Sequence, residues 1–171
     1  MKMDITIRLA HLDDAPDIAE IHIRSWEAAY KDIVPAEFIQ EKNSGRHAQY
    51  QRTLSAENKT LYLIAVDDKP AGVMGIIQPQ ENDTDETYHE LSIIYLHPGY
   101  FRKGIGTKAV NFAFDVARET GKKFMIVWVF AENHSSIQFY EKCGFILENK
   151  TKIINYGRAI DAIRMRKDFT S

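Results

Sequence analysis

The stretch from His97 to Phe114, HPGYFRKGIGTKAVNFAF, places two cations before two closely spaced glycines and an apolar-periodic run. The cations are Arg102 and Lys103, and the glycines are Gly104 and Gly106. Glycines let a backbone approach a ligand without the obstruction of Cβ atoms. A helix that begins there adds unpaired backbone amides and the positive end of its dipole. These residue types in this order predict an anion site, and a phosphate is the commonest anion at such a site.

Two well-known phosphate motifs fit this stretch only in part. The segment Gly104–Ala109 matches the loose G-x-G-x-x-A dinucleotide fingerprint, but seven residues separate it from the strand pattern that ends at Leu96. The segment Gly99–Gly104 matches the first half of a P-loop, yet Ile105 and Gly106 stand where the lysine and the hydroxyl residue are needed. The P-loop is therefore excluded, and the dinucleotide interpretation is poorly supported by its surroundings.

A third interpretation is a pyrophosphate cradle that uses no metal. Backbone N–H groups from about Arg102 to Thr107 would converge on one place, and the two cations would add charge. The diphosphate of coenzyme A fits such a cradle. The alternative is a glycine-containing loop that only begins a helix.

A second motif follows this loop, with Asn133 and then FYEKCGF from Phe139 to Phe145. Together with YLHPGYFRKGIG (Tyr95–Gly106), it resembles the GNAT superfamily of N-acetyltransferases, which use acetyl-CoA. The resemblance covers nearly the whole chain in element order and is strongest from residue 90 to residue 145. Phe101 departs from the family's pattern, which has Gln or Arg at this position. Because a phenylalanine side chain cannot donate hydrogen bonds to a diphosphate, we expect the backbone amides to carry the cofactor.

The resemblance implies that acetyl-CoA is the acetyl donor and that no metal takes part. A strand that separates from its neighbour at Ile94–Leu96 would hold the pantetheine arm through its backbone, like an added strand. The amide near Tyr95 or Leu96 would stabilise the thioester oxygen. The cofactor-binding residues implied in this way are Ile94, Tyr95, Leu96, Arg102, Lys103, Gly104, Ile105, Gly106, Thr107 and Asn133.

Two residues are the candidates for proton transfer. Tyr140 matches the family tyrosine, and a phenol with a pKa of about 10 can protonate a departing thiolate at neutral pH. Glu90 lies where some family members carry a strand glutamate that deprotonates the amine through water. The alternatives are a core aromatic at Tyr140 and a rim carboxylate at Glu90, and Tyr88 or His89 could substitute as the base.

The acceptor site is less well marked. Trp26 and Tyr30 lie four residues apart on one helix face, and they either wall the acceptor pocket or belong to the core. An acidic insert, residues 80–86, could attract a cationic acceptor such as a polyamine or a peptide amine. A solvated loop is the alternative for that insert. The predicted acceptor is therefore a primary amine on a small molecule, polyamine-like, or on a peptide.

Strand and helix patterns along the chain must position these residues. A strand pattern at Ile5–Ala10 precedes an amphipathic helix over 13–30, a short helix that opens at Pro35 and a polar, helix-tolerant stretch to Leu54. Two β-rich runs, a third strand at 91–96, a helix over 104–120, a buried strand over 122–130, a short helix and a closing hairpin follow. The expected fold is one α/β domain over residues 1–171. By resemblance, its mixed, mostly antiparallel sheet has a central splayed parallel strand pair and is flanked by helices.

Composition bounds the remaining possibilities. The 171 residues carry a net charge of -2, which offers no basic field for nucleic acid. No apolar run reaches the roughly 20 residues of a membrane span, no signal peptide is recognisable, and the protein is expected in the cytoplasm. The lone Cys143 excludes internal disulfides, and no histidines or acids have metal-ligand spacing. Edge strands are compatible with a homodimer. The alternative to an enzyme is a non-catalytic acyl-CoA-binding sensor of the same fold.

Overall fold

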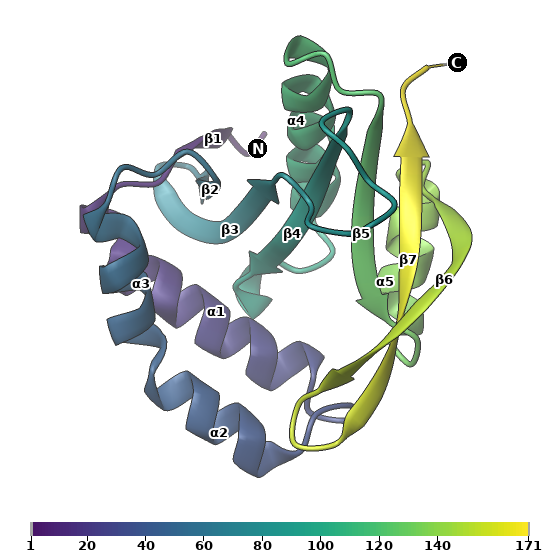
Figure 1. Cartoon of the computed structure of the whole chain (residues 1–171). Coiled ribbons are helices and arrows are strands. Elements are labelled where there is room, and N and C mark those ends of the chain that lie inside the picture. The colour runs from purple at the N-terminus through teal and green to yellow at the C-terminus, as the bar shows by residue number, and fades with distance from the viewer. Residues whose placement is uncertain (1, 171) are drawn as a thin grey trace. The chain divides into compact units, whose positions relative to one another are not determined.

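The computed structural model describes residues 2–170 and follows the predicted order of elements (Figure 1). In chain order, the elements are β1 (Ile5–Leu9), η1 (Leu12–Asp14), α1 (Ala15–Ala29), α2 (Ala36–Ser44), α3 (Arg46–Ser55), β2 (Leu61–Val66), β3 (Lys69–Ile77), β4 (Tyr88–Leu96), η2 (Pro98–Tyr100), α4 (Ile105–Glu119), β5 (Phe124–Phe130), α5 (His134–Lys142), β6 (Ile146–Asn155) and β7 (Ala159–Asp168). The polar stretch before Leu54 folds as a separate helix, α3. Two 3-10 turns, η1 and η2, are additions that the hydrophobic pattern did not indicate.

The strands form a seven-stranded sheet in the order β1-β2-β3-β4-β5-β7-β6. The β1–β2, β2–β3, β5–β7 and β6–β7 pairs are antiparallel, and β4–β5 is parallel. This confirms the predicted mixed, mostly antiparallel sheet with a central parallel pair. The sheet ends in β1 and β6, and the β6–β7 register shifts between Leu147 and Thr151, which marks a bulge in the edge strand β6. The expected homodimer stays a prediction.

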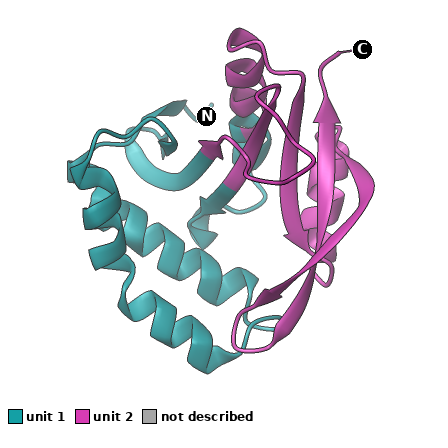
Figure 2. Ribbon diagram, viewed as in Figure 1, with its two compact units in different colours: residues 1–75, 93–109 teal, residues 76–92, 110–171 magenta. Residues whose placement is uncertain are grey.

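The chain divides into two compact units (Figure 2). Unit 1 comprises residues 1–75 and 93–109, and unit 2 comprises residues 76–92 and 110–171. The boundaries fall within β3, β4 and α4, so each unit contains parts of these elements. The expectation of one domain over residues 1–171 stays a prediction.

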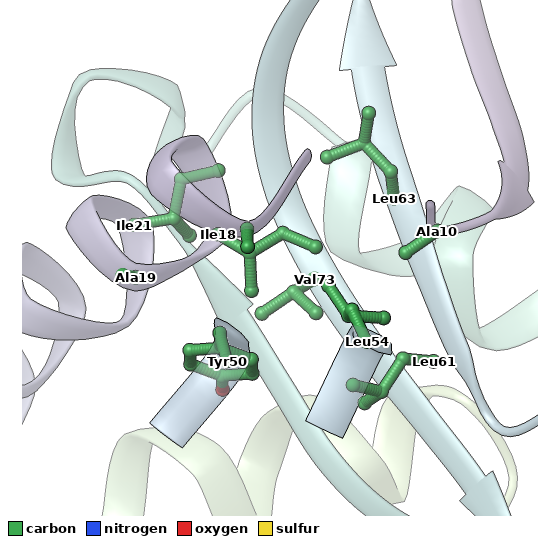
Figure 3. Packing of buried hydrophobic residues seen from close by; sticks show 10 residues of the cluster. Ala10, Ile18, Ala19, Ile21, Tyr50, Leu54, Leu61, Leu63 and Val73 are labelled. Carbon is green, nitrogen blue, oxygen red and sulfur yellow. The ribbon is translucent and has the colours of Figure 1, made fainter. Parts of the chain in front are cut away.

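The core of unit 1 is formed by side chains of α1 together with those of α3, β2 and β3 (Figure 3). Helix α1 buries one face at the 3.6-residue period, with Ile18, Ile21 and Trp26 among its inward side chains. Buried residues of α3, β2 and β3 complete this cluster, including Tyr50, Leu54, Leu61, Leu63 and Val73. Ile93 and Tyr95, near the end of β4, pack partly buried against it. The amphipathic pattern of the sequence thus places the end of β4 on the core formed by α1 and α3.

The core of unit 2 is centred on β5. Met125, Ile126 and Val127 are consecutive and all buried, as predicted for a strand covered on both faces. Ile160, Ala162 and Met165 of β7 are fully buried as well. Within residues 2–170, none of the helices has the length and apolar character that a membrane span requires.

A close approach between β3 and the end of β4 depends on Gly72. A Cβ atom at this position would lie 2.5 Å from Cδ2 of Leu96 and 2.9 Å from the carbonyl oxygen of Tyr95. The backbone N–H of His97 donates a 2.8 Å hydrogen bond to the carbonyl of Ala71 in the same region. Glycine at position 72 therefore fixes how close the predicted pantetheine strand lies to its neighbour.

Replacing Gly72 by alanine should destabilise the protein by about 1–3 kcal/mol, because the added methyl group meets backbone as well as side chain. The measurement is the free energy of unfolding in urea. Gly45→Ala is the control, because a Cβ there meets only the carbonyl oxygen of Lys42 at 3.7 Å. Equal stability of Gly72→Ala and the wild type would contradict this account of the strand packing.

Candidate active site

The predicted anion loop connects β4 to α4 in unit 1. After η2, the backbone of Arg102 and Gly104 is left-handed, with φ values of 58° and 79°. The imidazole Nδ1 of His97 accepts a 3.1 Å hydrogen bond from the N–H of Gly99, so His97 shapes the turn before the loop. Arg102 adopts a conformation that favours glycine, which indicates that the surrounding chain imposes the shape of the loop.

Donor groups gather where α4 begins. The amides of Ile105, Gly106 and Thr107 have no partner within the helix, because the first N–H groups of any helix lack one. Arg102 and Lys103 are exposed beside them, whereas the side chain of Ile105 is fully buried and anchors the turn. These donors and charges suit a diphosphate, whose oxygens only accept hydrogen bonds.

Phe101 is more than one third exposed, at 37%. Its side chain offers no hydrogen bond to a phosphate, in keeping with the departure seen in the sequence. The loop therefore depends on backbone amides and on its two cations for any anion that it binds.

A cluster of polar aromatic side chains surrounds His22 in unit 1. The ring of His22 stacks on Tyr95 with centroids 4.3 Å apart, and its Nδ1 lies 2.7 Å from the hydroxyl of Tyr50. Trp26 contacts His22 edge-on and is only 4% exposed, and it also contacts Tyr30 edge-on. The burial of Trp26 favours its interpretation as a core residue. Tyr30 is half-buried, and its role in acceptor binding stays a prediction.

Burial sets the protonation of this cluster. Burial, aided by the nearby positive charge of Arg46, lowers the pKa of His22 to about 3. Burial also raises the pKa of Tyr50. His22 and Tyr50 are therefore both neutral at physiological pH, and the hydrogen bond between them joins uncharged groups. Sequence reasoning missed this pair, because 28 residues separate its members.

Lowering the pH should reduce the free energy of unfolding through protonation of His22. An unfolded histidine takes up a proton near pH 6.5, whereas folded His22 resists protonation until about pH 3, so its contribution is complete above pH 6.5 and is lost as the pH falls. Between pH 7 and pH 5 the wild type should lose about 2 kcal/mol more than His22→Gln. Urea unfolding at several pH values measures this difference. His47→Gln, which replaces an exposed histidine, should behave like the wild type. Parallel pH profiles for the wild type and His22→Gln would contradict the assignment.

Glu90 lies on β4 in unit 2, where the parallel ladder joins Tyr88, His89 and Glu90 to Phe124, Met125 and Ile126. The carboxylate is half-buried. Burial raises its pKa, Glu81 adds to the increase, and the positive charges of Lys152 and Arg164 oppose it. A carboxylate with a raised pKa is a better base than an ordinary surface glutamate. The predicted separation of β4 from β5 at Ile94–Leu96 involves residues of both units and stays a prediction.

The acidic insert folds back onto the sheet of unit 2. Both carboxylate oxygens of Asp83 accept hydrogen bonds from Arg164, at 2.8 and 2.7 Å, and Lys150 approaches the same carboxylate at 3.3 Å. Arg164 is only 2% exposed and also donates through Nε to Glu148. The guanidinium of Arg164 holds the pKa of Asp83 well below its usual range. The insert therefore packs on the sheet through ion pairs. The sequence alone suggests either a surface that attracts a cationic acceptor or a solvated loop, and neither interpretation includes these ion pairs.

A second contact of the insert involves Glu81. Its carboxylate accepts a 3.0 Å hydrogen bond from the indole N–H of Trp128 and lies 3.6 Å from the ammonium of Lys152. Sequence reasoning did not single out Trp128, Lys152 or Arg164. The only available signal was the alternation of apolar and charged residues along the last two strands.

Tyr140 and Asn133 belong to α5 and its cap in unit 2. The amide oxygen of Asn133 accepts a 3.2 Å hydrogen bond from the N–H of Ser136, which confirms the predicted N-cap. Tyr140 is 7% exposed, and its ring packs edge-on against Phe139 and Phe145. The ring of Tyr140 therefore contributes to the core of unit 2. A catalytic role for its hydroxyl stays a prediction.

The structure distributes the predicted residues between the two units. Unit 1 contains the predicted loop, Ile94–Leu96, Trp26 and Tyr30, and unit 2 contains Glu90, Asn133 and Tyr140. Within the part of the chain that the structure describes, no three histidine, cysteine, aspartate or glutamate side chains gather as metal ligands.

Comparison with known proteins assigns these features to a family. The Acetyltransferase (GNAT) family profile matches residues 15–145. The chain is 29% identical to the uncharacterized N-acetyltransferase YuaI of Bacillus subtilis, over 80% of this chain and 78% of that protein. It is 28% identical to spermidine N(1)-acetyltransferase of Thermoplasma acidophilum, over 86% of this chain and 91% of that protein.

The fold also matches that of a solved structure. PaiA N-acetyltransferase from Thermoplasma acidophilum, in complex with coenzyme A, superposes with a TM-score of 0.77 over 97% of this chain and 99% of that chain. The two sequences are 21% identical, so this likeness concerns the fold. It confirms the α/β architecture that the motifs predicted.

Proposed function

The chain belongs to the Acetyltransferase (GNAT) family and is an acetyl-CoA-dependent N-acetyltransferase, and we propose that it transfers acetyl directly to the primary amine of a small cationic molecule. The observation that carries this proposal is Glu90, a half-buried carboxylate whose pKa is raised by burial. The similarity to a spermidine acetyltransferase supports a polyamine-like acceptor. A peptide amine is the other acceptor class to be tested.

The loop of unit 1 is the proposed site for the diphosphate of acetyl-CoA. Its left-handed backbone at Gly104 and the first amides of α4, which lack partners within the helix, fit an anion, and Arg102 and Lys103 supply charge. The cofactor supplies an activated acetyl thioester. We assign the pantetheine to the backbone of Ile94–Leu96 and to Asn133. In this assignment, an amide at Tyr95 or Leu96 polarises the thioester oxygen.

Glu90 acts as the base for the acceptor in this proposal. A primary amine with a pKa near that of lysine, about 10.4, arrives protonated at neutral pH and cannot attack a carbonyl in that form. Glu90 accepts one proton through water and leaves the nitrogen with a free lone pair. Its raised pKa makes this transfer less unfavourable than it would be to an exposed glutamate.

Tyr140 acts as the acid for the departing group. As the N–C bond forms and the C–S bond breaks, the electron pair of the latter remains on sulfur. Tyr140 then donates its hydroxyl proton to the thiolate, and the proton released by the acylated nitrogen reprotonates Tyr140, directly or through water. An ordinary phenol, with a pKa of about 10, carries this proton at neutral pH.

Tyr140→Phe should lower kcat about 100-fold, because it removes a general acid and keeps the ring that packs on Phe139 and Phe145. The KM for acetyl-CoA should change little. Steady-state thiol release measures both constants. Tyr156→Phe removes a hydroxyl elsewhere in unit 2 and should retain full activity. Full activity of Tyr140→Phe would reassign Tyr140 to the core.

Glu90→Gln should lower kcat/KM about 100-fold at neutral pH and remove the acidic limb of its pH profile. In the wild type that limb should lie above the ordinary glutamate pKa of about 4.3, because burial raises the pKa of Glu90. Stability should not fall, since the substitution removes a half-buried charge. Glu86→Gln, an exposed carboxylate on the insert, is the matched control. An unchanged acidic limb in Glu90→Gln would identify another base, with His89 the first to test.

The decisive experiment incubates the protein with acetyl-CoA and a panel of polyamines, amino acids and short peptides. Release of thiol above the hydrolysis background with polyamines supports the proposed acceptor class. Release with peptides alone would replace it. No release with any acceptor, while acetyl-CoA still raises the melting temperature, would favour an acyl-CoA sensor of the same fold.

A further inference from the structure

An alkylammonium group already occupies an aromatic surface of unit 2. The ammonium nitrogen of Lys152 lies 4.1 Å from the centroid of the Trp128 ring. The Glu81 carboxylate lies 3.6 Å from that nitrogen and accepts the 3.0 Å hydrogen bond of the indole N–H. An aromatic face and a carboxylate are together the groups that recognise a protonated amine in proteins.

This arrangement lies on the same face of the sheet as Glu90. Glu90 pairs with Ile126, and Trp128 lies two residues further along β5, so both side chains project to one side. Strand geometry puts their Cα atoms roughly 8 Å apart, across one strand spacing and along two residues. The face also carries Arg164, opposite Trp128 in the β5–β7 ladder. The guanidinium of Arg164 is occupied by Asp83 and Glu148.

We propose that Trp128 and Glu81 form a subsite for the second ammonium of a diamine acceptor and that Lys152 is its internal occupant, which the acceptor displaces. This inference rests on the proposed function, because it takes Glu90 as the group that receives the reacting nitrogen. It makes the acceptor class specific: a short aliphatic diamine or polyamine, with one amine at Glu90 and the next on Trp128.

The chemistry of Lys152 explains why it can be displaced. Its side chain is 41% exposed, so the lysine can return its ammonium to water at low cost. An incoming primary ammonium makes the same two contacts and leaves the net charge of the subsite unchanged. A neutral group makes no cation–π contact with Trp128, and an anionic group is repelled by Glu81. The presence of Lys152 on Trp128 therefore favours acceptors whose second group is cationic over acceptors whose second group is neutral.

Lys150 provides a matched comparison on the same strand. Its ammonium lies 3.3 Å from Asp83, and its side chain is 53% exposed. Lys150→Met and Lys152→Met remove the same charge two residues apart, but only the second vacates Trp128. The loss of one positive charge from β6 is therefore common to both variants, whereas the effect of Lys152 on the pKa of Glu90 is separated by comparing acceptors.

The first experiment compares diaminobutane with aminobutanol, in which a hydroxyl replaces the remote ammonium. Lys152→Met should lower the KM for diaminobutane about three- to tenfold relative to that for aminobutanol, because any effect through the pKa of Glu90 is common to the two acceptors. Lys150→Met should change neither constant by more than twofold. Equal effects of the two substitutions, or an equal effect on the two acceptors, would overturn the proposal.

The second experiment measures binding without turnover. Titration with diaminobutane should change tryptophan emission, at lower concentrations in Lys152→Met than in the wild type, and Trp128→Phe should abolish the change. If no amine is acetylated but this response persists, the proposed function fails and the subsite stands. Emission that does not respond to diaminobutane in Lys152→Met, whose fold is checked by its melting temperature, would refute the subsite.

Discussion

The burial of Arg164 determines how the charged and aromatic side chains around Glu90 are arranged in unit 2. A guanidinium at 2% exposure is tolerable only when carboxylates compensate for its lost hydration. Asp83 and Glu148 do so, and Asp83 can reach Arg164 only if the insert folds back onto the sheet. That fold-back brings Glu81 onto Trp128. The polarity around Glu90 thus follows from one buried cation and its partners.

In unit 1, the groups that are predicted to bind the cofactor belong largely to the backbone. Side chains of α1 and α3 bury the surroundings of Tyr95, and Gly72 allows the end of β4 to lie close to β3. The left-handed residues Arg102 and Gly104 then turn the chain sharply into α4. A rigid core that presents backbone amides suits a ligand with few distinguishing side groups, such as a diphosphate or a pantetheine arm.

Local patterns in the sequence were enough to predict most of the elements. The period of α1, the glycines that end α4 and α5, and the Asn133 cap are short-range signals, and the structure confirms them. The contacts of Arg164 with Asp83, across 81 residues, and of His22 with Tyr50, across 28 residues, were beyond such signals. No pattern in a single chain encodes which distant charges will meet, so the roles of Trp128 and Lys152 emerged only from the fold.

The bulge in β6 has a consequence for association between chains. β6 is an edge strand, and it exposes Ile146, Leu147 and Ile153, a combination that invites another strand to add. The register shift between Leu147 and Thr151 interrupts the row of free N–H and C=O groups midway. A foreign strand can therefore follow this edge for only a few residues before its hydrogen bonds fall out of step. The bulge in β6, near Lys150 and Lys152, thus protects the protein against edge-to-edge aggregation.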